Sequence, residues 1–305
     1  MGIYVIKRVL LALVTLLLVA SITFALMNLI PGGPFLSEKA PSEATLKALN
    51  EKYGLDKPVI VQFKNYLEKA IRGDFGPSIK QRGRTVIQII TTGFKVSARV
   101  GGLAILLAVL TGVPLGSIAA LNRGKWIDNV IIVISTSGIA IPSFVVSTVL
   151  MMIFSVKLGW LPTYGLTSPL HYVMPVAALA FYPSAYITRL MRSGMLEVLG
   201  QDYMRTAKAK GLSQFVSLFK HALRNAILPV VTYLGPLLAY TLTGSFIVEK
   251  IFTIPGLGNE FISSIINRDY TLIMGTTIFL AMLIISMNLL VDIAYKIIDP
   301  RIKLK

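Results

Sequence analysis

A series of apolar runs constrains this chain more than any other feature, since each is close to the ~20 residues that a helix needs to cross a bilayer. Six such runs can be drawn, separated by polar stretches. They cover approximately residues 9–30, 97–121, 128–156, 172–191, 227–248 and 272–298. The fourth is the weakest, because it is short and contains Pro175 and Pro183. The pattern predicts an all-α, polytopic membrane protein with about six transmembrane helices.

Composition supports the same class. Of the 305 residues, 54% are hydrophobic and only 14% are charged, whereas a soluble domain carries roughly 25% charged residues. The net charge of +16 comes from basic residues that cluster between apolar runs. This clustering fits the positive-inside rule and contact with membrane lipid, so no nucleic-acid partner is expected. The chain has no Cys, which excludes a disulfide framework and a thiolate metal site.

The distribution of charge predicts the orientation. Lys7 and Arg8 precede a first apolar run that is too long for a signal peptide, so it is interpreted as a retained span. With the N-terminus inside, the short outer loops hold only Lys157, Lys250 and Arg268. The Lys-rich loop 31–96 exceeds the roughly 60-residue limit within which loop charge governs topology. Both termini are therefore predicted to be cytoplasmic, with a long extracytoplasmic loop after the first span.

Four segments follow from this topology. They are the first span in 1–30, the outer loop in 31–96, a five-helix core in 97–299 with a cytoplasmic loop at 192–226, and a cytoplasmic tail in 300–305. The outer loop contains amphipathic helical patterns, the clearest of them from Val59 to Ile71. Such a helix can lie on the membrane surface or pack over the outer mouth of the protein, and packing is the favoured prediction.

The cytoplasmic loop contains a polar, basic island from Asp202 to Pro229. It is interpreted as two short helices: Asp202 is a candidate N-cap, and Gly211 suits the left-handed position that ends a helix. Ser213 can cap the second helix. Pro229 lies near the start of the next apolar run, where a missing N–H is tolerated.

This island resembles the "EAA" loop of ABC importer permeases, with which those proteins dock on an ATPase subunit. The pattern Tyr-x-x-Thr-Ala-x-Ala-Lys-Gly is typical of the peptide and nickel branch and is matched here from Tyr203 to Gly211. The outer-loop sequence Pro31-Gly32-Gly33-Pro34 and the ending Asp299-Pro300-Arg301 are also similar to that branch. The likeness spans nearly the whole chain and leans toward the oligopeptide permeases.

The resemblance implies a subunit of a bacterial cytoplasmic-membrane importer that takes up oligopeptides by alternating access. It implies a sister permease, two cytoplasmic P-loop ATPases that bind ATP and Mg, and an external peptide-binding lipoprotein as partners. The chain itself would hold no cofactor and would not be an enzyme. The residues expected to dock on the ATPase are Tyr203, Arg205, Thr206, Ala207, Lys208, Lys210, Gly211 and Leu212.

The chemistry that the chain lacks points the same way. There is no phosphate-binding loop G-x-x-x-x-G-K-[ST], no catalytic constellation and no convincing metal-ligand cluster. Asp292 is the one acidic residue expected inside a span, and a secondary carrier, the distant alternative, needs more such charges. Dipeptide and nickel importers stay open as nearer alternatives. The residues expected on the translocation pathway, from position alone, are Ser143, Gly244, Ser245, Glu249 and Asn288.

Overall fold

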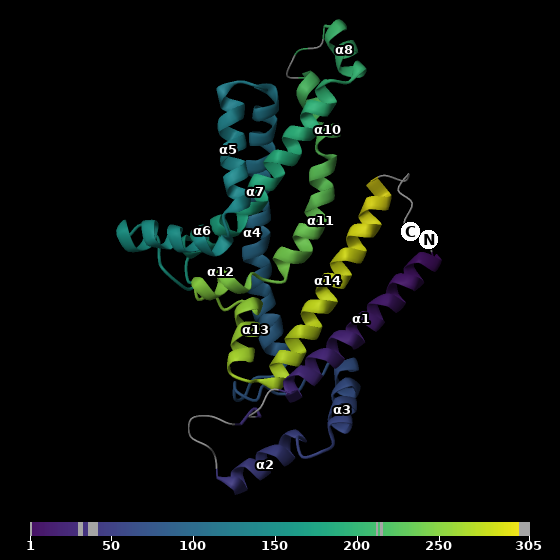
Figure 1. The fold of residues 1–305 in the computed structure, drawn as a ribbon, viewed down its shortest axis with the longest axis vertical. Coiled ribbons are helices and arrows are strands. Elements are labelled where there is room, and N and C mark those ends of the chain that lie inside the picture. The colour runs from purple at the N-terminus through teal and green to yellow at the C-terminus, as the bar shows by residue number, and fades with distance from the viewer. Residues whose placement is uncertain (1, 30–32, 36–41, 212, 214–215, 299–305) are drawn as a thin grey trace.

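A computed structural model describes residues 2–29, 33–35, 42–211, 213 and 216–298. Figure 1 labels the α-helices of this part of the chain, which also contains two π-helical segments, η1 and η2. Their bounds are α1 (Gly2–Leu29), α2 (Glu43–Tyr53), α3 (Val59–Ile71), α4 (Val86–Leu121), α5 (Trp126–Ala140), α6 (Ser143–Leu150), η1 (Met151–Lys157), α7 (Leu170–Leu199), α8 (Asp202–Ala209), η2 (Ser217–Ala222), α10 (Leu223–Ala226), α11 (Leu228–Leu242), α12 (Phe246–Ile251), α13 (Leu257–Ile266) and α14 (Tyr270–Ile298).

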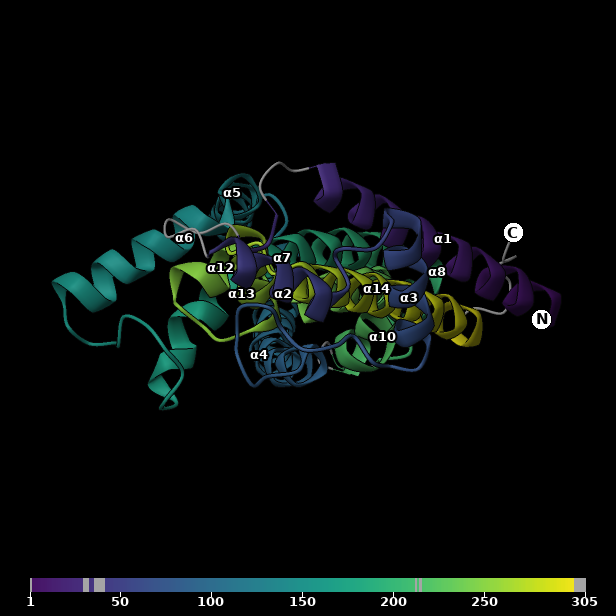
Figure 2. The ribbon, with the colours of Figure 1, turned by 90° about the horizontal axis from the view of Figure 1, so that it is seen from below.

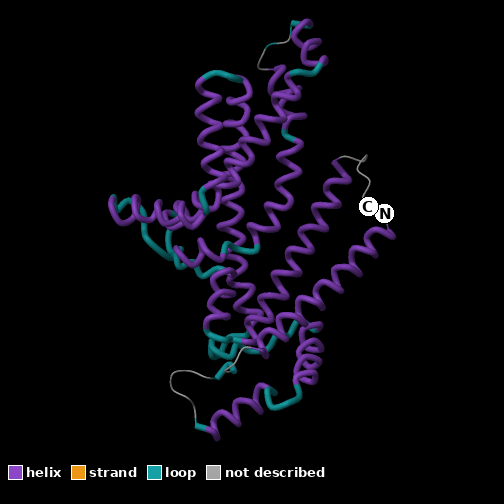
Figure 3. Tube along the Cα trace, in the orientation of Figure 1, coloured by secondary structure: helices purple, strands orange, loops and turns teal. Residues whose placement is uncertain are grey.

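The long helices run up and down a single bundle in alternation (Figures 1 and 3). Helices α1 and α14 are antiparallel neighbours, so the start of one lies near the end of the other. Helix α8 lies at one extreme of the bundle, while α2 and α3 lie at the opposite extreme. Following the positive-inside rule, we call the end with α8 the cytoplasmic end and the other the outer end. Among the described residues there is no β-strand, which confirms the all-α prediction.

The centre of the bundle is the contact between α4 and α7. Two glycines of α4 allow it: a Cβ on Gly112 would come within 2.7 Å of the Ile187 side chain, and one on Gly116 would strike the backbone of Thr188. Small residues let helices approach closely in lipid, where burial of apolar area alone drives no association. Around this contact, α4 and α7 share one buried apolar cluster with α8, α10 and α11. These helices therefore form one packed unit.

The predicted spans are mostly confirmed as helices. Among the described residues, four helical segments are long and apolar enough to cross a membrane: 6–29, 86–121, 223–251 and 270–290. The predicted fourth span is a continuous helix, α7, which supplies the centre of the bundle and contains both predicted prolines, Pro175 and Pro183. The chain is thus an all-α protein with several membrane-crossing helices.

Two span predictions need correction. The run 128–156 was predicted as one span, but α5 and the α6–η1 pair are bent by 104° between them. The bend falls at Pro142, whose ring disfavours helical backbone at Ile141, which is extended here. The second span was predicted from residue 97, yet α4 begins at Val86, after a capping box in which Thr85 and Gln88 bond reciprocally. Polar and basic residues of its first turns concealed this start.

At the outer end, α3 packs against the bundle. Its Phe63, Tyr66 and Leu67 contact a buried cluster that α1 and α14 supply together. This contact confirms the packing prediction for that face of the amphipathic helix. Figure 2, seen from below, shows α2 and α3 crossing under the bundle, with α1 and α4 at opposite edges.

Candidate functional site

Helix α8, which carries the motif of the basic island, is held to the bundle by one buried side chain. Met204 is 1% exposed and belongs to the apolar cluster that includes Val198, Ala222 and Ala226. A second contact joins the two helices of the island, because the Asn225 Nδ2 donates a hydrogen bond to the Tyr203 hydroxyl oxygen at 3.0 Å. Helix α8 is therefore positioned by α7 on one side and by the η2–α10 helix on the other.

The other side chains of α8 that the structure describes, and the described residues directly after the helix, are exposed. Tyr203 is 42% exposed, and Arg205, Thr206, Lys210 and Gly211 are exposed as well. Ala207 and Lys208 lie within the helix, while Leu212 lies outside the described residues. Asp202 was predicted as the N-cap but is the first helical residue, and it pairs with Arg205 at 3.5 Å. Both side chains of this pair are more than three-quarters exposed, so the pair contributes little stability.

The turn after α8 has the predicted geometry. Gly211 has a φ of +73°, in the left-handed region that favours glycine. The Ser213 hydroxyl accepts a hydrogen bond from the Val216 backbone N–H at 3.3 Å, which confirms its capping role. Pro229 lies in the first turn of α11, also as predicted. The described part of the island thus folds as two short helices, with Gly211 and Ser213 between them in the predicted roles.

The end of α7 that leads into α8 is fixed by an ion pair that sequence reasoning missed. The Arg192 guanidinium donates to both carboxylate oxygens of Asp128, at 2.7 and 2.8 Å. Asp128 is 1% exposed and also accepts the Gly124 N–H at 2.9 Å. Because Asp128 lies in the first turn of α5, the pair ties the α4–α5 turn to the last two turns of α7. The pairing is bidentate, the geometry in which Arg–carboxylate bonds are strongest.

A second buried carboxylate organises the segment from α11 to α13. Glu249 of α12 is 2% exposed and accepts hydrogen bonds from the Ser97 hydroxyl at 2.6 Å and from the Asn259 N–H at 3.0 Å. Ser97 in turn accepts the Leu257 N–H at 2.8 Å. The bonds join α12 and the start of α13 to the middle of α4. Glu249 was predicted to line the pathway; the structure shows its carboxylate buried and bonded within the chain, and its role on a pathway stays a prediction.

The other predicted pathway residues are scattered. Ser245 caps α12 by accepting the Val248 N–H at 3.3 Å, and Gly244 lies beside Glu249 with a φ of +91°. Ser143 opens α6, where its carbonyl accepts the Ser147 hydroxyl. Asn288 is exposed on α14. The structure brings together Gly244, Ser245 and Glu249, but it does not join them to the remaining two, so their place on a pathway stays a prediction.

A third carboxylate, also missed from sequence, fastens the outer loop. Asp269 is 1% exposed and accepts hydrogen bonds from the Ser78 hydroxyl and from the backbone N–H groups of Ile79, Lys80 and Leu272. The residues that precede α4 are thereby held against the start of α14.

Comparison with known proteins decides the family. The description "Binding-protein-dependent transport system inner membrane component" matches residues 112–304, and its N-terminal counterpart matches residues 1–103. The chain belongs to this family. It is a multi-pass inner-membrane component of a binding-protein-dependent transport system, and the resemblance to ABC importer permeases is confirmed.

Curated relatives align with the permease from end to end. The dipeptide transport system permease protein DppB of Bacillus subtilis (strain 168) is 50% identical over 301 residues, which cover 99% of this chain and 98% of that one. The oligopeptide transport system permease protein OppB of Haemophilus influenzae is 43% identical, and that of Escherichia coli (strain K12) is 38% identical, with 98% of this chain and 99% of theirs covered.

Solved structures show the same fold. An inward-facing MetNI methionine ABC transporter matches with a TM-score of 0.57 at 14% identity, over 69% of this chain and 96% of that chain. An amino acid ABC transporter matches with a TM-score of 0.52 at 20% identity, over 71% of this chain and 95% of that chain. About seven-tenths of the permease therefore shares a known importer fold.

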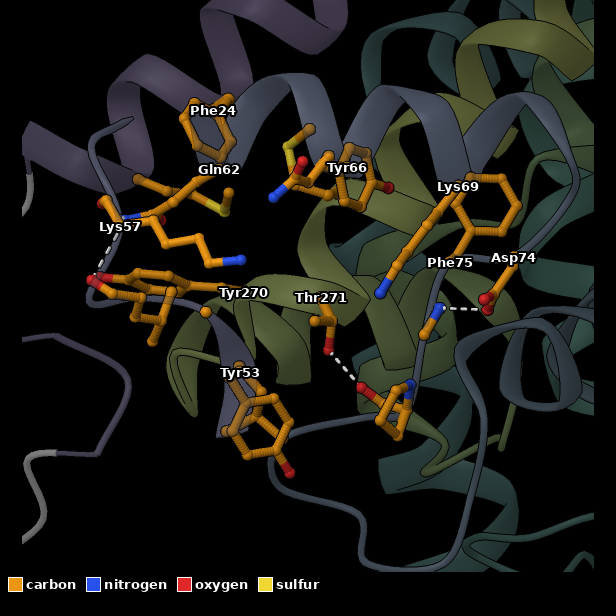
Figure 4. A pocket seen from close by; sticks show the side chains of 18 of the residues that line it. Phe24, Tyr53, Lys57, Gln62, Tyr66, Lys69, Asp74, Phe75, Tyr270 and Thr271 are labelled. Carbon is orange, nitrogen blue, oxygen red and sulfur yellow. Dashed lines mark hydrogen bonds between the residues drawn. The ribbon is translucent and has the colours of Figure 1, made fainter. Parts of the chain in front are cut away.

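The permease also has a cavity of about 600 Å³ at its outer end. Figure 4 shows Tyr66 and Lys69 of α3 on one wall, facing Tyr270 and Thr271 of α14. The lining mixes both signs of charge: Lys52, Lys57, Lys69 and Arg72 with Glu51, Glu68 and Asp74. The Tyr66 hydroxyl is buried without a hydrogen-bond partner among the described residues, and burial raises the pKa of this phenol. The cavity is lined by residues of α2 and α3 together with residues from the outer ends of α1 and α14.

Proposed function

We propose that this chain is the membrane-spanning permease subunit of an ATP-driven importer that takes up peptides delivered by an external binding protein. The observation that carries the proposal is the geometry of α8: a short helix outside the bundle with an exposed basic face and one buried anchor. A partner can bind the exposed face of such a helix without unfolding the permease core. ATP and Mg would be bound by that partner, and the permease would catalyse no reaction.

Docking on an ATPase subunit is supported by what α8 leaves exposed. Its outward side chains combine an aromatic ring, Tyr203, with the cations Arg205 and Lys210. Cations at an interface attract an acidic partner surface over a distance of about one Debye length. A Cβ added at Gly211 would have no described atom within 4 Å. A partner protein can therefore approach the backbone closely at this position. Ala207, Lys208 and Leu212 complete the proposed docking set.

The contacts that hold α8 and the end of α7 in place support a role of α8 in coupling. Met204 connects α8 to α7 and α10, and Arg192–Asp128 connects α7 to α5. A displacement of α8 would therefore move several spans together, as rigid-body transitions between inward and outward states require. Close packing at Gly112 and Gly116 extends this rigid unit along α4.

Two sizes of peptide are supported by different observations. The outer-loop motif Pro31-Gly32-Gly33-Pro34 favours oligopeptides by resemblance. The 50% identity to a dipeptide permease, against 43% and 38% to two oligopeptide permeases, favours dipeptides. Because the identities refer to the full length and the motif to four residues, dipeptide uptake is kept beside oligopeptide uptake as a second candidate function.

The test is reconstitution of this chain with the sister permease, the ATPase and the binding protein that co-purify with it. ATP-dependent uptake of a labelled dipeptide and a labelled pentapeptide would be measured in proteoliposomes. We expect uptake of at least one peptide only when ATP and binding protein are both present. Uptake by the purified chain alone, driven by a proton or sodium gradient, would contradict the proposal and favour a secondary carrier.

A further inference from the structure

Helix α4 carries an unexpected row of polar residues on its exposed face. Gln88, Thr92, Lys95 and Arg99 recur at intervals of three or four residues and are all exposed, so they lie on one side of the helix. The same face continues with exposed leucines, Leu103, Leu106 and Leu110. The opposite face is the packed one, where Ser97, Gly101, Ala104 and Ala108 are buried. The outer half of this exposed face is thus polar and cationic, and the inner half is apolar.

The two cations of this row have no neutralising partner among the described residues. In the part of the chain that the structure describes, no side-chain hydrogen bond or ion pair involves Lys95 or Arg99. They stand four residues apart on a helix, where like charges repel. An anion close to both would relieve that repulsion.

Their depth argues that this face does not contact lipid tails. Arg99 precedes the cytoplasmic end of α4 at Leu121 by 22 residues, about 33 Å at ~1.5 Å per residue. The hydrocarbon core is about 30 Å thick, so Arg99 lies near its outer boundary. Charged side chains on membrane-crossing helices almost always face a water-filled cavity or another protein element. The cationic half of α4 is therefore expected to line an aqueous route into the protein.

A cavity of about 440 Å³ adjoins Arg99. Its other walls include Thr167, Ser168 and Tyr172, which come from the start of α7 and the loop before it. His171 fixes this rim: its Nδ1 lies 2.8 Å from the Ser168 Oγ and accepts the Ser168 backbone N–H at 3.2 Å. Hydroxyl donors facing a guanidinium make a suitable environment for an oxyanion, because a carboxylate can accept two hydrogen bonds from Arg.

We propose that Lys95 and Arg99, with the Thr167–Ser168 rim, form an oxyanion site in the outer mouth of the transport route. The ligand is the C-terminal carboxylate of a peptide in transit. This assignment rests on the proposed function as a peptide permease. The site supplies a first contact for the carboxylate that every unmodified peptide carries at its C-terminus.

The location is tested first, without any assumption about the substrate. Because the chain has no Cys of its own, Arg99→Cys can be labelled specifically on this subunit with a membrane-impermeant maleimide. The assembled importer would be labelled in proteoliposomes, with Leu13→Cys on the exposed, apolar side of α1 as the matched control. We expect Arg99→Cys to react and Leu13→Cys to resist. An unreactive Arg99→Cys would place this face against lipid or protein and overturn the assignment.

The charge is tested by uptake of one peptide in two forms, the free acid and the C-terminal amide. With the same binding protein throughout, we expect Arg99→Gln to reduce uptake of the acid about tenfold, the effect of one charged hydrogen bond. Uptake of the amide should change less than about twofold, and Arg99→Lys should restore most of the preference. Lys157→Gln, at an exposed cation on η1, serves as the control.

Equal losses for acid and amide would contradict carboxylate recognition, even if Arg99→Cys is accessible. If the wild-type importer takes up neither form, the proposed function fails, whereas the labelling result still reports whether the α4 face is aqueous. The two failures are therefore distinguishable.

Discussion

The cytoplasmic helix α8 and the α12–α13 junction around Glu249 are both polar elements next to apolar spans, but they are built in opposite ways. At the junction, the Glu249 carboxylate is buried and bonded to Ser97 and Asn259, all within the chain. Among the α8 side chains that the structure describes, Met204 is the buried one, while Arg205 and Thr206 face outward. The polar groups of the junction are hydrogen-bonded within the chain, whereas the exposed polar groups of α8 are available to a partner protein.

This difference separates residues that hold the permease together from residues that engage a partner. A buried carboxylate must be satisfied where it lies, because unpaired burial is costly. An exposed cation has no such requirement and is available for docking. Substitutions at the junction should therefore act on stability, whereas substitutions on α8 should act on association.

The largest loss of stability is expected at the Arg192–Asp128 pair, which fixes the end of α7 that leads into α8. Arg192→Ala leaves Asp128, which is 1% exposed, without its charged partner, and removing one member of a buried pair costs about 3–5 kcal/mol. The apparent melting temperature of the detergent-purified complex should fall accordingly. The double variant Asp128→Ala/Arg192→Ala should recover part of the loss; no recovery would show that the side chains act by packing and not as a pair.

A somewhat smaller loss is expected at the junction. Glu249→Ala removes the acceptor of the Ser97 and Asn259 donors, and each unsatisfied buried donor costs about 1–3 kcal/mol. Glu249→Gln keeps one acceptor oxygen and should be milder. If Glu249→Ala retains the wild-type melting temperature but loses uptake, the residue belongs to the pathway, as first predicted from sequence, and the contrast with α8 breaks down.

The turn after α8 gives an intermediate case. Gly211→Val forces a branched side chain into a backbone with φ +73°, which costs about 1–2 kcal/mol locally. We expect reduced recovery of ATPase with the purified permease, at a nearly unchanged melting temperature of the spans. Gly211→Asn is the matched control, since Asn tolerates left-handed backbone. Equal ATPase recovery for all three chains would remove this turn from the docking site.

The smallest effect is expected at the Asp202–Arg205 pair. Both side chains are largely exposed at a separation of 3.5 Å, and exposed pairs are worth little. Asp202→Asn should leave the melting temperature unchanged, while Arg205→Glu should weaken ATPase association most strongly at low salt. Loss of stability in Asp202→Asn would show that α8 depends on its surface charges.

The sequence predicted the features that depend on residues close to one another in the chain. The turn at Gly211, the cap at Ser213 and the start at Pro229 each depend on residues close together in the sequence. The number of spans was predicted less well, since six were expected and four described helical segments are long and apolar enough, or five if the bent α5 and α6–η1 pair counts as one span. Sequence reasoning failed where distant residues meet: Ser97 and Glu249 are 152 positions apart, and Ser78 and Asp269 are 191 apart. It also placed the start of α4 at residue 97 instead of Val86, because Gln88, Thr92 and Lys95 interrupt the apolar pattern that marks a span.

The most direct test of the central claim is site-specific crosslinking from α8. A single cysteine at exposed Thr206 and another at exposed Lys250 beside the junction would each carry a short photoactivatable crosslinker in the assembled importer. We predict that Thr206→Cys crosslinks to an ATPase subunit and that Lys250→Cys does not. An intact complex in which Thr206→Cys yields no ATPase adduct would contradict the assignment of α8 as the docking helix.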